Sequence, residues 1–158
     1  MKYAIIVLCA LFFTTGAMGQ GQPLLRKAAD IPIRWSYEVK KLDRNEYELI
    51  FRADLQKGWH IFSQNPGDSS LIGPTFSFDD NGNIRRLGEL KEKGKLTETT
   101  MEGYDAKIRY FEGVVEFIQK ISYLGESTKI TGEHRFQICN DNMCLPPATQ
   151  RFEFLIAK

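Results

Sequence analysis

The chain has 158 residues, of which 42% are hydrophobic and 26% are charged. This length suits one domain with a hydrophobic core of its own. The 21 Lys and Arg residues nearly balance the 20 Asp and Glu residues, so the net charge is only +1. A charge this close to zero argues against nucleic acid or an anionic membrane surface as the partner.

Residues 1–19 have the features of a secretory signal peptide. Lys2 supplies the positive n-region, residues 4–13 the apolar h-region, and residues 17–19 a small-x-small cleavage site. The apolar run is too short to span a membrane, which needs about 20 residues. We therefore expect cleavage near Gly19/Gln20 and a mature protein in the periplasm or secreted from the cell.

Cleavage at this point divides the chain into three parts. These are the signal peptide (1–19), a lead-in (20–32) and one domain (33–158). Cys9 leaves with the signal peptide, so two of the three cysteines remain in a compartment where disulfides persist. No later segment is apolar enough to span a membrane, so we expect no membrane span in the mature chain.

The rest of the sequence is dominated by alternation of apolar and polar residues, the pattern of half-buried strands. The predicted strands, in chain order, are 33–39, 47–55, 59–62, 75–78, 84–90, 108–111, 114–123, 129–139 and 151–156. Residues 63–73, rich in Ser, Gly, Asn and Pro, and residues 91–95, charged and containing Gly, are expected to be loops.

No stretch has apolar residues at helical spacing, and no internal repeat is present. About eight or nine short strands with regular turn signals predict an all-β protein, an immunoglobulin-like β-sandwich. A closed β-barrel remains the alternative, because the sequence does not fix the order of the strands.

The chemistry of the domain is concentrated in its two cysteines, Cys139 and Cys144. The intervening Asn140-Asp141-Asn142 has turn composition, and Pro146-Pro147 stiffens the exit from the loop. If Ile138 points into the core, alternation puts Cys139 on the other face of its strand, at the strand end. The two thiols would then meet at the edge of a sheet, where a partner protein can reach them.

Three interpretations of this cysteine pair follow from the residues alone. A structural disulfide that closes so short a loop would stabilise the fold by only about 2 kcal/mol. An exchange disulfide is favoured slightly by the same short spacing. A metal site lacks a second ligand pair, since His60 and His134 are the only histidines and each lies in a predicted strand. We expect no metal and no cofactor, and no motif of a serine hydrolase is present.

The cysteine loop also resembles a known family. Residues 139–147 (CNDNMCLPP), followed by Phe-Glu-Phe at 152–154, are similar to the N-terminal periplasmic domain of the thiol:disulfide interchange protein DsbD. Residues 57–63 (KGWHIFS) and 110–117 (YFEGVVEF) are similar to strands of the same family. The resemblance covers residues 33–156, and the cysteine loop with its Pro-Pro exit is its most specific part.

The resemblance implies an immunoglobulin-like sandwich that passes electrons through its cysteine pair. In that family the domain takes electrons from a thioredoxin-like domain and reduces periplasmic partners, among them disulfide isomerases and proteins of cytochrome c maturation. The second cysteine of the loop pairs with partners, which assigns this role to Cys144 and the role of resolving thiol to Cys139.

Family members also shield the cysteine pair with a cap loop that carries an acidic residue and an aromatic residue. The corresponding stretch here, residues 99–104, reads TTMEGY and does not reproduce the acidic-aromatic run. Met101, Glu102 and Tyr104 are the residues expected to shield the sulfurs, with ordinary loop packing as the alternative.

Two hypotheses about function follow. The first is a periplasmic thiol-disulfide exchange module of the protein-disulfide reductase type. Because the chain has no Cys-x-x-Cys and no spanning segment, we expect its thioredoxin-like partners and its membrane electron donor to be encoded separately. The alternative is a domain that keeps the fold but has lost the electron relay. The second is a β-sandwich used for binding or assembly, in which the disulfide is structural.

Overall fold

The computed structural model describes residues 31–79, 83–125 and 129–156. Ten strands and no helix lie in these ranges, so none of them contains a helix that could cross a membrane. The predicted signal peptide and most of the lead-in lie outside the described residues. The strands are β1 (Ile33–Lys41), β2 (Glu46–Leu55), β3 (His60–Phe62), β4 (Thr75–Phe78), β5 (Ile84–Arg86), β6 (Lys91–Thr99), β7 (Ile108–Tyr123), β8 (Lys129–Phe136), β9 (Ile138–Cys139) and β10 (Ala148–Leu155).

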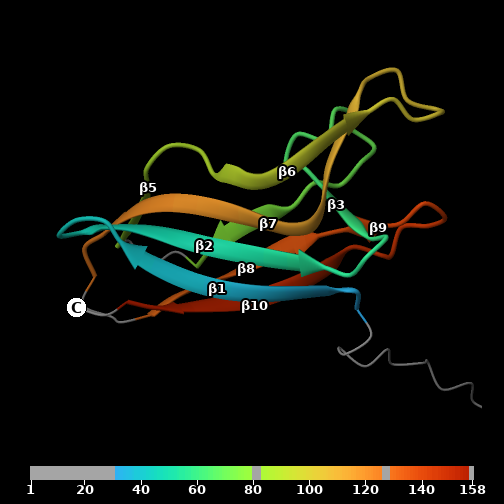
Figure 1. The fold of residues 1–158 in the computed structure, drawn as a ribbon. Helices are drawn as coiled ribbons and strands as arrows, with labels where there is room; N and C mark the ends of the chain where they lie inside the picture. The colour runs from blue at the N-terminus through green and yellow to red at the C-terminus, as the bar shows by residue number, and fades with distance from the viewer. Residues whose placement is uncertain (1–30, 80–82, 126–128, 157–158) are drawn as a thin grey trace, which may run out of the picture. The chain divides into compact units, whose positions relative to one another are not determined.

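The strands form two antiparallel sheets that pack against each other (Figure 1). The larger sheet has the order β1-β2-β7-β3-β9, and β5 and β6 pair with the other edge of β7. The smaller sheet has the order β10-β8-β4. Side chains of both sheets belong to one buried hydrophobic cluster. The predicted all-β, immunoglobulin-like sandwich is confirmed, and the two separate sheets exclude the closed barrel.

Strand β7 bends at Gly113, where φ is +65°. Glycine adopts this left-handed conformation without the steric cost that other residues incur. On one edge, residues 114–122 pair with β2 and residues 110–112 pair with β3. On the other edge β6 pairs with both halves. The sequence predicted two strands here, but the Gly113 bend lies within one continuous strand of 16 residues.

The charged segment 91–95, expected to be a loop, is the first half of β6. This prediction was wrong because most β6 side chains are exposed, so the strand has no buried apolar face to reveal it. Backbone hydrogen bonds to β7 define the strand instead. The predicted strand 129–139 also divides at Gln137, since β8 joins the smaller sheet and β9 joins the larger one.

The main core is built from aromatic side chains contributed by both sheets. Phe51 of β2 is fully buried, and its ring centroid lies 4.5 Å from that of Phe76, 4.8 Å from that of Phe152 and 5.0 Å from that of Phe154. Aromatic pairs in such tilted and edge-to-face arrangements contribute about 0.5–1.5 kcal/mol each beyond the area they bury. The alternation that predicted β2 therefore reflects one face packed on this core.

His134 of β8 is fully buried within this aromatic core. Its Nε2 atom forms a 2.9 Å hydrogen bond with the hydroxyl of Tyr37, and among the described residues its Nδ1 atom has no partner. The rings of Phe76 and Phe136 stack on the imidazole at centroid distances of 5.7 and 5.3 Å. Burial lowers the pKa of His134 from 6.5 to about 4, so the imidazole is neutral at neutral pH.

We predict that this buried histidine makes the fold sensitive to acid. Between pH 6.5 and 4 the unfolded chain takes up a proton at His134 and the folded chain does not, so stability falls as the pH falls. At 1.36 kcal/mol per pKa unit the loss is about 3 kcal/mol at most. Urea unfolding at pH 7, 5.5 and 4 measures this loss in the natural protein and in His134→Phe.

The difference between the two proteins isolates the histidine. Any cost of leaving the Tyr37 hydroxyl unpaired in His134→Phe is the same at every pH in this range and cancels. If the variant loses as much stability as the natural protein between pH 7 and 4, protonation of His134 is not the cause.

Candidate functional site

Strand β9 leads directly into a tight hairpin closed by a disulfide between Cys139 and Cys144, whose Cα atoms lie 3.9 Å apart. The Asn140 amide donates a 2.9 Å hydrogen bond to the Met143 carbonyl. The Asn140 side-chain oxygen accepts hydrogen bonds of 2.9 Å from the amides of Asn142 and Met143. Asparagine favours such turns because its side chain can bond the backbone two residues on. The turn composition read from the sequence therefore folds the loop as expected.

The base of the hairpin is held by hydrogen bonds around Leu145. Its amide donates to the Ile138 carbonyl at 3.0 Å, and its carbonyl accepts a 3.0 Å hydrogen bond from the Gln137 side chain. The Leu145 side chain is buried in the main core. The exposed Pro146-Pro147 follows and directs the chain into β10. These contacts hold the loop in place from both ends.

The two cysteines differ sharply in exposure. Cys139 is 2% exposed, whereas Cys144 is exposed and lies next to Met143, which is 51% exposed. Ile138 points into the main core, so alternation places the Cys139 side chain on the opposite face of β9, as the sequence predicted. A protein that approaches this loop therefore meets Cys144 first.

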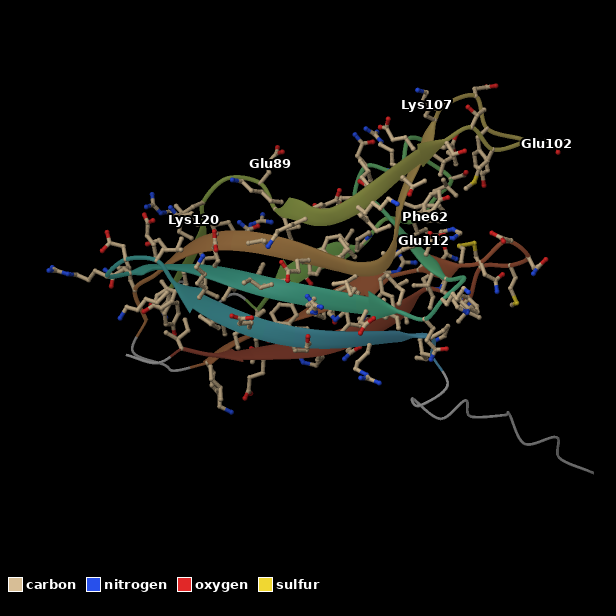
Figure 2. The ribbon with its side chains drawn as sticks, viewed as in Figure 1. Phe62, Glu89, Glu102, Lys107, Glu112 and Lys120 are labelled. Carbon is tan, nitrogen blue, oxygen red and sulfur yellow. A yellow bond between two sulfur atoms is a disulfide. The ribbon has the colours of Figure 1, made fainter. Side chains whose placement is uncertain are left out.

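Cys139 belongs to a small hydrophobic cluster separate from the main core. The buried members are Cys139, Phe62 and Ile108, and partly buried Leu71, Met101, Tyr104 and Tyr110 pack against them. Figure 2 shows Phe62 close to the point where β3 approaches β7. The cluster places one cysteine in apolar surroundings, which favour the neutral thiol over the thiolate once the disulfide is reduced.

Two segments cover this small cluster: the loop of residues 63–74 and the hairpin between β6 and β7. Glu92 of β6 fixes the start of the loop, because its carboxylate accepts 2.7 Å hydrogen bonds from the Ser63 hydroxyl and the Gln64 amide. Gly67 has a φ of +100°, and a Cβ atom there would lie 2.1 Å from the Lys107 carbonyl oxygen. The loop and the hairpin are therefore in close contact.

The structure brings two of the three expected shielding residues to the cysteine cluster. Met101 and Tyr104 are partly buried against it. Glu102 is exposed and lies at the outer tip of the β6–β7 hairpin (Figure 2).

His60 of β3 is a neighbour of Cys139, whereas the sequence pattern predicts for it only a place in a strand. In the sheet it lies opposite Cys139 on one side and opposite Glu112 on the other. It is 7% exposed, and its pKa is lowered by burial, against the opposing influence of Glu112 and Asp141. No local sequence signal predicts this neighbourhood, because it depends on pairing between distant strands.

Within residues 31–79, 83–125 and 129–156, no group of three or more His, Cys, Asp or Glu side chains is placed to hold a metal ion.

The comparisons with known proteins agree with this geometry. The family model described as "Thiol:disulfide interchange protein DsbD, N-terminal" matches residues 32–156. The N-terminal periplasmic domain of ScsB from Proteus mirabilis has a similar structure, with a TM-score of 0.62 and 12% sequence identity. The match covers 84% of this chain and 49% of that one, so this chain spans about half the length of that structure.

Two further solved structures match less well. The reduced N-terminal domain of DsbD from Neisseria meningitidis has a TM-score of 0.47 at 13% identity, and the match covers 77% of this chain and 84% of that one. The yeast GGA1 GAE domain has a TM-score of 0.43 at 7% identity, with 77% and 90% covered. No curated protein matches the sequence.

Proposed function

Because this chain belongs to the family of N-terminal domains of the thiol:disulfide interchange protein DsbD, we propose that it exchanges thiols and disulfides with partner proteins through Cys139 and Cys144. The observation that carries the proposal is the unequal exposure of the two cysteines. Cys144 is exposed, whereas Cys139 is buried in a small cluster against which Met101 and Tyr104 pack. An exchange pair needs this division between one thiol that meets the partner and one that resolves the complex.

Reduction of a partner's disulfide would then take place in two steps. The Cys144 thiolate attacks a disulfide of the partner, a mixed disulfide forms, and one partner thiolate leaves. The Cys139 thiol loses its proton and attacks the Cys144 sulfur, which restores the Cys139–Cys144 bridge and releases the second partner thiolate. Two electrons have passed to the partner, and an electron donor must reduce the bridge before the next cycle.

A structural role for the disulfide is supported less well. The hairpin is already held by backbone hydrogen bonds at its turn and at its base. A bridge between residues only five apart would add about 2 kcal/mol to the stability of the fold. The binding or assembly hypothesis therefore assigns the bridge only a small effect on stability, whereas the exchange hypothesis explains why one of the two cysteines is exposed.

We further propose where the protein works and with which partners. The similar ScsB domain is described as periplasmic, which agrees with the signal peptide expected over residues 1–19. Thioredoxin-like periplasmic proteins are the expected exchange partners, and a membrane protein is the expected electron donor. Proteins of cytochrome c maturation are among the acceptors expected from the family resemblance.

The reduction potential of the pair is the first test of this function. We expect a value between roughly −180 and −230 mV, the range of exchange proteins. Equilibration of the Cys9→Ser protein in glutathione buffers, followed by counting of free thiols, measures it. A value below about −300 mV marks a structural bridge and would favour the binding module.

Trapping experiments, with both variants in the Cys9→Ser background, test the roles of the two cysteines. With oxidised glutathione, we expect reduced Cys139→Ala to form a stable mixed disulfide at Cys144, because the resolving thiol is missing. Reduced Cys144→Ala should react slowly, because Cys139 is buried. Mass spectrometry detects the added glutathione, and diagonal gels of periplasmic extract extend the test to proteins. Faster reaction of the Cys144→Ala protein would reverse the assignment.

We also propose that Met101 and Tyr104 shield Cys139, and alkylation tests this. In the Cys9→Ser/Cys144→Ala background, Cys139 is the only thiol. Truncating both cap residues to Ala should speed its reaction with iodoacetamide about tenfold, as expected for a loss of ~1.4 kcal/mol in the free energy of local opening. Glu102→Ala is the matched control, since Glu102 is exposed at the hairpin tip. Equal rates in the two variants would mean that the cap does not shield Cys139.

A further inference from the structure

His60 lies in the middle of the short ladder that links β7, β3 and β9. Its register partners are Glu112 on β7 and Cys139 on β9. Residues directly opposite in antiparallel strands project from the same face, with Cβ atoms about 4.5–5.5 Å apart. The imidazole therefore lies beside the buried cysteine, on the face covered by the small hydrophobic cluster.

The surroundings of the ring keep it neutral at neutral pH. His60 is 7% exposed, and its ring centroid lies 4.7 Å from that of Tyr110 and 5.3 Å from that of Phe62. Burial lowers the pKa of His60 below 6.5, and the carboxylates of Glu112 and Asp141 oppose that shift in part. The imidazole is thus free to accept a proton, and the two carboxylates stabilise the imidazolium once it forms.

The other titratable groups around Cys139 are poorer proton acceptors. Tyr110 stays protonated, because burial and the charges of Glu112 and Asp141 raise its pKa. Carboxylates are weaker bases than imidazole. Cys139 needs such a base, because apolar surroundings favour the thiol form and only the thiolate attacks a disulfide.

We propose that His60 acts as the base that accepts the proton of the Cys139 thiol when the mixed disulfide on Cys144 is resolved. The proton moves from the Cys139 sulfur to an imidazole nitrogen, and the thiolate attacks the Cys144 sulfur. The Cys139–Cys144 bond forms, the bond from Cys144 to the partner sulfur breaks, and its electron pair leaves with the partner thiolate. The imidazolium then returns its proton to solvent. This inference rests on the proposed exchange function.

The test uses the aromatic disulfide DTNB as the probe, with the reduced Cys9→Ser protein. Attack by Cys144 releases the first coloured thiolate, and resolution by Cys139 releases the second, so the two steps are read separately. This leaving group departs as a thiolate and needs no proton. The rate of the second release therefore reports the deprotonation and attack of Cys139.

In the natural sequence we expect the rate at which the second coloured thiolate is released to be nearly independent of pH between 7 and 8. This rate should fall below pH 6.5, as His60 becomes protonated. In His60→Phe and His60→Gln it should be slower at pH 7 by about tenfold or more, as is typical when a general base is lost. The rate in these variants should rise steadily with pH, because the thiol must then ionise without help. The rate at which the first coloured thiolate is released, which reports attack by Cys144, should be the same in these variants as in the natural sequence.

His134→Phe is the matched control, because it removes a buried histidine from the other sheet and should leave both releases unaltered. If both His60 variants keep the natural rate and pH profile, or slow by one constant factor at every pH, His60 is not the base. If the natural protein itself never gives the second release, the exchange function fails instead. The two failures are thereby distinguished.

Discussion

The bend at Gly113 is the constraint on which the site depends. It lets a single strand, β7, pair with β2 along one half and with β3 along the other. β3 pairs with the half of β7 that precedes Gly113, and among the described strands β9 pairs with β3. The short β7-β3-β9 ladder therefore begins beside one residue in the left-handed region, and it carries Cys139, to which Cys144 is bridged, to the end of the sheet.

Within that ladder, successive side chains point to opposite faces of the sheet, so the core-packing residues and the residues near the disulfide lie on different faces. Ile61 and Ile138 face the main core and fix the position of the two short strands. His60 and Cys139 face the other way, into the small cluster. A shift of one residue in the register would exchange these two faces, and the side chains of His60 and Cys139 would then point into the main core. The packing of two isoleucines thus sets the surroundings of the Cys139 sulfur.

The sequence predicted the parts of this arrangement that depend on local pattern. The alternation from Tyr47 to Leu55 located β2, and the composition of residues 140–142 located the turn. It did not predict β6, because an exposed edge strand is held by backbone bonds that leave no apolar pattern. It did not bring His60 to Cys139 either, since pairing between distant strands follows from the bend in β7 and from no local feature of either residue.

The division of the apolar residues into two clusters has a dynamic consequence. The aromatic core around Phe51 joins the two sheets, whereas the cluster around Cys139 involves only one end of the larger sheet and the segments that cover it. Opening the cap would expose Met101 and Tyr104 but would leave the aromatic core intact. Segments with few buried contacts open locally at a lower cost than the whole fold. The sandwich can therefore remain rigid while the segments that cover Cys139 move, which is what the proposed role of Cys139 as the resolving thiol requires.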